Sequence, residues 1–368
     1  MRRLLCLLLF LPTIALAQTS DLLLRNASGT AANPGVSPHH VVANGDWSGY
    51  VEGAAFLTSV SEKGPAVQRH ETFSTNWLAA AAQRSIGSRG LVLFRVRGSA
   101  EPLTIKSDGY PQLFQRISRD AGGPLVDAMR AQDLIGEAAM QVAWRATASS
   151  YAHLYLAPVG DPAIGALPYA VRASSEEFAE GPFAYSVEEP VHGATRVITG
   201  GFTSSVIAFD GGVFHHSITT GRHSSIDDGN IDSWGARVTI TPVRNVSLQA
   251  SHGSLGDAKT RVNSASLSLG GESGALSAIW TELGGLRSMA LEALGRVSRN
   301  TFMARGENNK LEERTHVTVG YILDLANRGG YRAGVGVNID YHTRTRALTA
   351  VYGHKPQSIY LFARVRKR

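Results

Sequence analysis

An alternating stretch at residues 315–342 constrains the fold more than any other part of this sequence. Apolar side chains occupy every second position from Val317 to Leu325, and polar residues stand between them, with Ile322 as the exception. After a turn at residues 326–330, an apolar row from Tyr331 to Tyr341 repeats the pattern. Successive side chains of a strand leave opposite faces, so this period of two predicts a β-hairpin.

The hairpin has the features of a membrane-spanning pair of strands. Each arm is about 11 residues long, which lets a tilted strand cross a bilayer. A soluble sandwich could bury the same apolar face, but here the opposite face carries charges and glycines. Tyr331 and Tyr341 also stand at the two ends of the apolar row, where an aromatic girdle would lie. We therefore expect the apolar row to face lipid and the polar face to line a wet lumen.

The first residues predict export. Met1–Arg3 is positively charged, Leu4–Leu16 is apolar, and Ala15-Leu16-Ala17 is a small-x-small cleavage motif. We expect residues 1–17 to be a signal peptide, cleaved after Ala17. The single cysteine, Cys6, lies inside it, so the mature chain has no disulfide framework. Residues 18–45 lack sustained periodicity and are predicted to be a flexible periplasmic leader.

The remaining residues, 46–368, are predicted to form one all-β domain, a transmembrane antiparallel β-barrel of about sixteen strands, within a range of fourteen to eighteen. No later stretch approaches the roughly 18 apolar residues of a helical span. Long connections at 100–133 and 158–194 alternate with short ones, including a predicted turn at residues 209–211. Such barrels have short periplasmic turns and long extracellular loops, so both termini are expected in the periplasm. A soluble periplasmic β protein is the alternative.

Charge narrows the choice of partners. The formal net charge is +6, but the basic residues are scattered and no recognisable module accompanies them, which argues against nucleic acid as a partner. An outer-membrane location implies contact with membrane lipid, with lipopolysaccharide and with the barrel-assembly machinery. Small solutes or ions are the expected cargo, and no cofactor is expected.

Three segments carry a resemblance to a known family. Asp127–Ala139, Tyr155–Ser175 and Ile231–Pro242 resemble a family of uncharacterised bacterial outer-membrane proteins, and the similarity spans Trp47 to Leu255. Some members occur near copper and heavy-metal resistance genes, so the resemblance implies a barrel in the outer membrane and a link to metal tolerance. The family has a histidine-rich run where this sequence keeps only His192.

Transport is the first functional hypothesis, because a barrel of about sixteen strands leaves room for an aqueous channel. Charged residues inside a pore set its ion preference, and the arginine excess among those predicted here favours anions. The alternative is that these charges pair across the lumen and fill it. The predicted pore-lining residues are Arg95, Arg97, Arg237, Glu292, Arg296, Asp324, Arg332, Asp340 and Arg364.

Metal handling is the second hypothesis, because imidazole and carboxylate together bind divalent transition metals. The candidate ligands are His192, His215, His216 and His223, with Asp227 and Asp228 nearby in the sequence. Adjacent histidines on a strand point to opposite faces, which works against joint chelation by His215 and His216.

Two further hypotheses complete the set. A lipid-modifying hydrolase would draw a serine and a histidine from Ser217, Ser233, Ser251, His252 and His316. The sequence has no GxSxG elbow, so we expect no enzyme. A structural or adhesive surface barrel is the last alternative.

Overall fold

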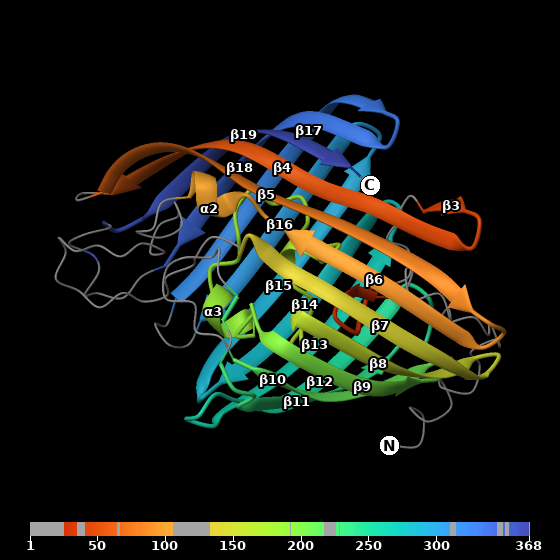
Figure 1. The fold of residues 1–368 in the computed structure, drawn as a ribbon. Helices are drawn as coiled ribbons and strands as arrows, with labels where there is room; N and C mark the ends of the chain where they lie inside the picture. Colours follow the sequence, from red (N-terminus) through yellow and green to blue (C-terminus); the bar gives the residue numbers. More distant parts are fainter. Residues whose placement is uncertain are drawn as a thin grey trace, which may run out of the picture.

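The computed structural model describes residues 26–34, 41–64, 67–105, 133–191, 193–216, 226–227, 229–309, 314–343, 349 and 353–367. Sixteen antiparallel strands, β4 to β19, close into one barrel (Figure 1), and β19 hydrogen-bonds to β4. A short strand, β3 (Val42–Asn44), pairs with the start of β4. The predicted all-β fold and strand number are confirmed.

The barrel strands follow one another along the chain, and each pairs with its sequence neighbour. Their bounds are β4 Trp47–Gly64, β5 Val67–Ile86, β6 Gly90–Gly98, β7 Ile135–Thr147, β8 Ser150–Val159, β9 Thr195–Thr203, β10 Ile207–His215, β11 Ser233–Ile240, β12 Val246–Leu255, β13 Thr260–Gly271, β14 Gly274–Leu283, β15 Leu286–Val297, β16 Asn300–Asn309, β17 Arg314–Arg328, β18 Tyr331–His342 and β19 Gln357–Lys367. The described residues also form two short helices, α2 (Glu101–Thr104) and α3 (Tyr185–Glu188), and one 3-10 turn, η1 (Tyr169–Val171). No helix in the described part of the chain is long and apolar enough to cross a membrane.

The hairpin expected at residues 315–342 is confirmed as β17 and β18. Its strands run further into the turn than expected, which leaves Gly329 and Gly330 between them, both at positive φ. Glycine adopts this conformation without the steric cost that other residues bear. The apolar exception, Ile322, is fully buried on the inner face and belongs to an apolar cluster within the lumen.

The outer face of the barrel is apolar and the inner face is polar. Val317, Trp234 and Val335 are 41%, 43% and 45% exposed, whereas His316 and Asp340 on the inner face are fully buried. Large exposed apolar side chains recur at alternate positions on most strands. This is the arrangement of a barrel that faces lipid, and the opposite of a soluble sandwich with a dry interior.

A charge placed on the outer face should destabilise the protein in a bilayer. Val335 lies in β18 between Leu323 and Ala363 of the neighbouring strands. We expect V335R to lower the unfolding free energy in phospholipid vesicles by about 2–4 kcal/mol, because the guanidinium would enter hydrocarbon. Urea titration of the vesicle-inserted barrel measures this. V335L is the control, and equal stability of the two variants would argue against a lipid-facing row.

The two ends of the barrel differ in their connections. One end holds the two chain ends of the barrel and seven turns of at most five residues, at 87–89, 148–149, 204–206, 241–245, 272–273, 298–299 and 329–330. The other end holds the longest connections, at 99–134, 160–194, 216–232 and 343–356. The predicted alternation of short and long connections is therefore present.

The turn predicted at residues 209–211 is wrong. Phe209, Asp210 and Gly211 lie within β10, and the turn is at residues 204–206. Asp-Gly favours turns, but here Asp210 is buried on the inner face, where its Oδ1 lies 2.9 Å from His153 Nε2. This contact joins β8 to β10 across β9, where Gly201 is the register partner of both residues, and it outweighs the local turn preference.

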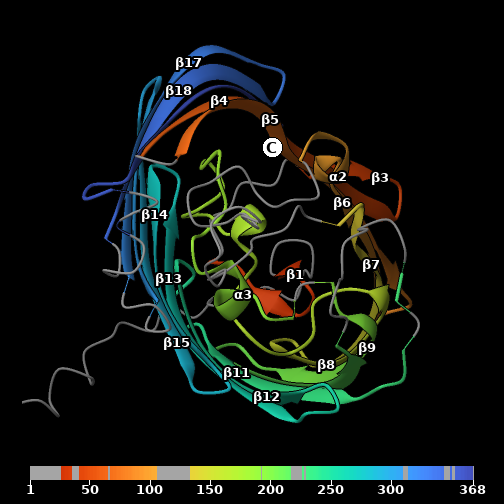
Figure 2. The ribbon, with the colours of Figure 1, turned by 90° about the vertical axis from the view of Figure 1, so that its left-hand side faces the viewer.

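Two segments fill the lumen. The first, which we call the lumen loop, is the connection 160–194 between β8 and β9, whose α3 lies inside the ring of strands (Figure 2). The second, the N-terminal hairpin, is residues 26–34 with β1 (Asn26–Ser28) and β2 (Ala31–Ala32), and it too lies inside the ring. The prediction of a flexible leader therefore does not hold for residues 26–34, because their backbone pairs internally and the barrel buries them.

Candidate functional site in the lumen

The predicted pore-lining residues all lie on the inner face of the barrel wall or at its rim. Arg95, Arg97, Arg237, Glu292, Asp324, Asp340 and Arg364 are buried, and Arg296 and Arg332 are partly buried. Most of them contact the lumen loop, the N-terminal hairpin or each other. The lumen charges are therefore extensively paired in this structure, as the alternative reading of the sequence allowed.

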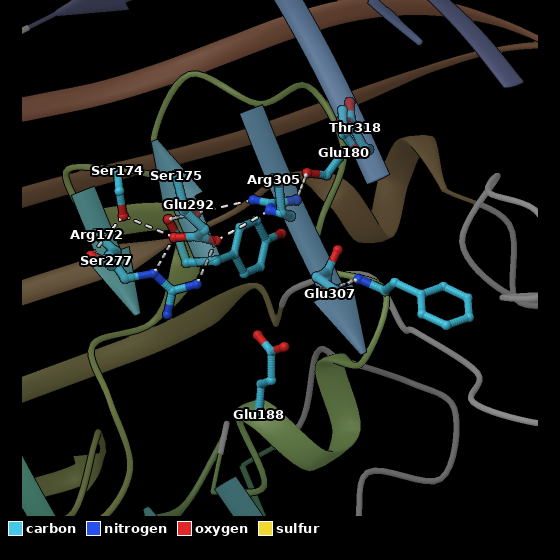
Figure 3. Close-up of polar contacts among 12 residues, drawn as sticks. Arg172, Ser174, Ser175, Glu180, Glu188, Ser277, Glu292, Arg305, Glu307 and Thr318 are labelled. Carbon is cyan, nitrogen blue, oxygen red and sulfur yellow. Dashed lines mark hydrogen bonds and ion pairs between the residues drawn. The ribbon is translucent and has the colours of Figure 1, made fainter. Parts of the chain in front are cut away.

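One cluster of buried polar side chains joins the lumen loop to β15 and β16 (Figure 3). Arg172 of the loop donates from Nε and Nη2 to the two oxygens of Glu292, at 2.8 and 2.9 Å. Ser174 Oγ donates to Glu292 Oε2 at 2.8 Å, and Arg305 Nε donates to Oε1 at 3.1 Å. Since all four side chains are buried, this carboxylate holds two guanidinium groups away from water.

A second cluster joins the loop to three wall arginines. Glu176 and Glu177 accept hydrogen bonds from Arg296, at 2.7 and 3.2 Å. Arg364 pairs with Glu177 and also with Asp324, while Arg366 pairs with Glu176. Loop carboxylates thus neutralise the basic side of the lumen wall.

A third set of contacts fixes the end of the loop. Glu307 of β16 accepts hydrogen bonds from the backbone N–H groups of Phe183 and Ala184, at 2.6 and 3.3 Å. Asn338 donates to Glu180 Oε2 at 2.7 Å. Backbone groups of the loop therefore find their partners on the barrel wall.

The N-terminal hairpin is held by arginines of β6 and β11. Arg95 donates to the carbonyl oxygens of Asn26 and Gly29, and it pairs with Glu137 at 2.8 Å. Arg97 donates to Ser28 Oγ, and Arg237 donates to Thr30 Oγ1 at 2.7 Å.

The hairpin and the lumen loop also pack against each other. Gly29 has a positive φ, and a Cβ at this position would lie 2.3 Å from the carbonyl oxygen of Asp161. The cavity between the two segments, lined by residues such as Ala31, Asp161 and Glu189, has a volume of about 20 Å³. That is room for about one water molecule. Solutes cannot pass between the two segments unless one of them moves.

The lumen loop is acidic, whereas the pore lining predicted from the sequence has an excess of arginine. The loop carries one arginine among its described residues and six carboxylates, at Asp161, Glu176, Glu177, Glu180, Glu188 and Glu189. These acids offset the arginines of the wall, so the arginine excess that suggested anion preference does not describe the filled lumen.

Burial raises the pKa of three acids in the loop. The pKa of Glu180 rises to about 8 because the group is buried and lies near Asp340. The pKa of Glu188 rises to about 8 because of burial and the nearby Glu307. Burial raises the pKa of Glu189 to about 7. At neutral pH the docked loop therefore holds protons that the same acids would release in water.

Docking of the loop should weaken as pH rises. A solvated glutamate has an ordinary pKa of about 4.5. The docked state therefore binds more protons than the undocked state between this pH and about 8, and docking is strongest below that window. We expect the rate of limited proteolysis within the loop, corrected for the pH dependence of the protease on an unfolded substrate, to rise several-fold between about pH 5 and about pH 9. E188Q should reduce this rise, and E282Q at a partly exposed site outside the lumen should not. A pH-independent wild type would contradict the assignment.

Two of the candidate metal ligands, His192 and His223, lie outside the described residues, so the site predicted from all four histidines stays a prediction. Both ring nitrogens of His215 face carboxylates, Nδ1 at 2.8 Å from Asp232 and Nε2 at 3.3 Å from Asp227. The backbone N–H of His216 donates to Asp232, while burial lowers the pKa of its imidazole.

The serines and histidines considered for hydrolysis are engaged elsewhere. Ser233 Oγ donates to Asp232, and Ser251 Oγ accepts a hydrogen bond from the Gly165 backbone of the lumen loop. His252 Nδ1 lies 2.7 Å from Asn263. His316 is held by carboxylates, and Ser217 lies outside the described residues. Among the described residues, none of these serines forms a hydrogen bond with one of these histidines.

Several residues of the lumen were not singled out from the sequence. They are Arg172, Arg305, Glu307 and Arg366, together with the N-terminal hairpin. Arg305 and Arg366 alternate with outward apolar neighbours, so the period of two could have identified them. The small residues of the hairpin carry no comparable signal.

The fold is similar to that of bacterial porins of known structure. Salmonella typhi OmpF, solved in complex with daunomycin, matches 89% of this chain and 99% of its own, with a TM-score of 0.55 and 10% sequence identity. A triple mutant of Rhodopseudomonas blastica porin matches 86% of this chain and 99% of its own, with a TM-score of 0.45 and 10% identity. No protein-family model and no curated protein matches the sequence. At this identity the likeness to OmpF supports the barrel fold, and function is argued from the lumen.

Proposed function

We propose that this protein is a porin-like channel of the bacterial outer membrane for small solutes or ions, narrowed by the lumen loop and the N-terminal hairpin. The observation that carries the proposal is a charged, polar lumen inside a closed sixteen-strand barrel with an apolar outer face. A barrel of this strand number is wide enough for an aqueous channel. We propose the nine predicted wall residues, together with the loop carboxylates, as the pore lining.

The charge of the loop favours cations. Three of its carboxylates, Asp161, Glu176 and Glu177, pair with wall arginines and neutralise them. Further buried acids such as Glu62 and Glu137 add to the acidic groups of the lumen. Fixed charges in a pore attract the ion of opposite sign. We therefore propose mild cation preference in place of the anion preference expected from the wall residues alone.

Planar bilayer recording tests the proposal. The purified full chain should form channels above background, and a salt gradient should give a reversal potential of the sign that reports cation preference. Absence of channels would contradict a transport function. Channels with anion preference would support transport and overturn the assignment of the loop as the determinant of selectivity.

The location is part of the same proposal. Cleavage after Ala17, insertion by the barrel-assembly machinery and contact of the apolar belt with lipid and lipopolysaccharide follow from an outer-membrane barrel. The short-turn end would face the periplasm. The link to metal tolerance rests on the family resemblance and stays a prediction, and the protein is proposed as a channel rather than an enzyme.

A further inference from the structure

A compact group of potential metal ligands lies on the inner wall of β17 and β18. His316 is the register partner of His342, and Thr318 is the partner of Asp340. His316, Asp340 and His342 are all buried, and one ligand atom from each lies within 4.8 Å of the others. Register between two neighbouring strands therefore gathers two imidazoles and one carboxylate.

We propose that His316, Asp340 and His342 bind one divalent transition-metal ion. Imidazole and carboxylate are ligands of Zn²⁺, Ni²⁺ and Cu²⁺ rather than of Mg²⁺ or Ca²⁺, which prefer oxygen alone. Two ligands at about 2.1 Å from an ion stand at most about 4.2 Å apart, so a pair of ligand atoms at the 4.8 Å limit must close by about 0.6 Å or more. The two rings are stacked, with centroids 4.4 Å apart and planes 7° apart. Binding therefore also requires the His342 ring to turn.

Neighbouring groups already orient two of the ligands. His316 Nδ1 lies 2.9 Å from Glu307 Oε2, and Thr318 Oγ1 donates to Asp340 Oδ1 at 2.8 Å. Histidines that bind metals usually donate their second ring N–H to a carboxylate in this way, which fixes the ring. The other nitrogen, Nε2, lies 3.2 Å from Asp340 Oδ2. This geometry points to Nε2 as the metal-binding atom of His316.

The lumen loop covers this site. The Phe183 ring packs against the rings of His316 and His342, with centroids 5.4 and 5.6 Å away. Glu307 accepts hydrogen bonds both from His316 and from the Phe183 backbone. An ion therefore reaches the site only when the side chain of Phe183 moves. The site itself does not depend on whether the barrel conducts.

Zinc binding to the full chain in detergent tests the proposal. After chelator treatment and dialysis against Zn²⁺, elemental analysis should find about one zinc per wild-type chain. H342N and D340N, with far-UV circular dichroism unchanged, should bind at least about ten-fold more weakly. H252N changes an exposed histidine outside the site and should bind like wild type. H215N should also bind like wild type, and loss of zinc in H215N instead of H342N would overturn the assignment.

A second measurement needs no variant and applies even if a substitution prevents folding. Titration calorimetry of wild type with Zn²⁺ should show binding of about one zinc per chain, and Mg²⁺, which prefers oxygen ligands alone, should give no comparable heat. A wild-type chain that binds no stoichiometric zinc would overturn the site as a whole.

Discussion

Replacing residues 162–192 of the lumen loop with a short glycine–serine turn is expected to raise single-channel conductance about five-fold or more. The replacement suits the barrel, because the Gly160 N–H already donates to the Ala194 carbonyl at 3.0 Å and closes the base of the loop. Val159 and Thr195 are register partners, so the strands need only a hairpin turn between them. The barrel can therefore lose the loop without losing its strand pairing.

The same deletion should reverse the ion preference. Arg296, Arg364 and Arg366 would lose their loop partners, Glu176 and Glu177, and would face water in the lumen. A basic wall attracts anions, so the reversal potential in a salt gradient should shift toward anion preference.

A charge-only variant separates the two effects of the deletion. E176Q/E177Q keeps the volume of the loop but removes two of its negative charges. It should shift the reversal potential in the same direction with a much smaller change in conductance. A deletion variant that folds and conducts like the full chain would show that the loop does not narrow the pore.

E292A is expected to release the lumen loop from the wall. Glu292 is fully buried and pairs with both Arg172 and Arg305, so its loss leaves two buried guanidinium groups without this partner. Removing one partner of a buried ion pair typically costs about 3–5 kcal/mol. We therefore expect the free energy of opening the loop to fall by about 3–5 kcal/mol.

Hydrogen exchange of loop amides measures that change. The amides of Phe183 and Ala184 donate to Glu307 in the docked loop and should exchange about a hundredfold faster, or more, in E292A. E282A is the matched control, because Glu282 pairs with Arg287 at the partly exposed outer surface and such pairs contribute at most about 1 kcal/mol. Equal exchange in the two variants would mean that the Glu292 cluster does not hold the loop.

The fold could be predicted from local sequence because alternate residues of each strand face lipid and the lumen, and their polarity differs accordingly. Val317 and Val335 face outward and His316 and Asp340 face inward as the period of two predicted. The strand number was likewise predicted correctly. Strand ends were less certain, since β17 and β18 extend through most of the turn expected at residues 326–330.

Only part of the candidate site could be predicted from the sequence. The wall charges could be predicted because they lie on the polar face of periodic strands. Their partners could not, because Arg172 and Glu292 are 120 residues apart and Glu177 and Arg364 are 187 apart. No local pattern encodes a pairing across a lumen. The acidic composition of the loop was visible, but not that its acids would meet the arginines of the opposite wall.

The sequence by itself determined a sixteen-strand barrel with an oily exterior and an ionised interior, because alternation is a property of each strand alone. Only the tertiary structure decided what occupies that interior. The lumen loop and the N-terminal hairpin enter it because their backbone and charged groups find partners on strands far away in the chain. The His316–His342 pair was decided in the same way, by the register between two strands.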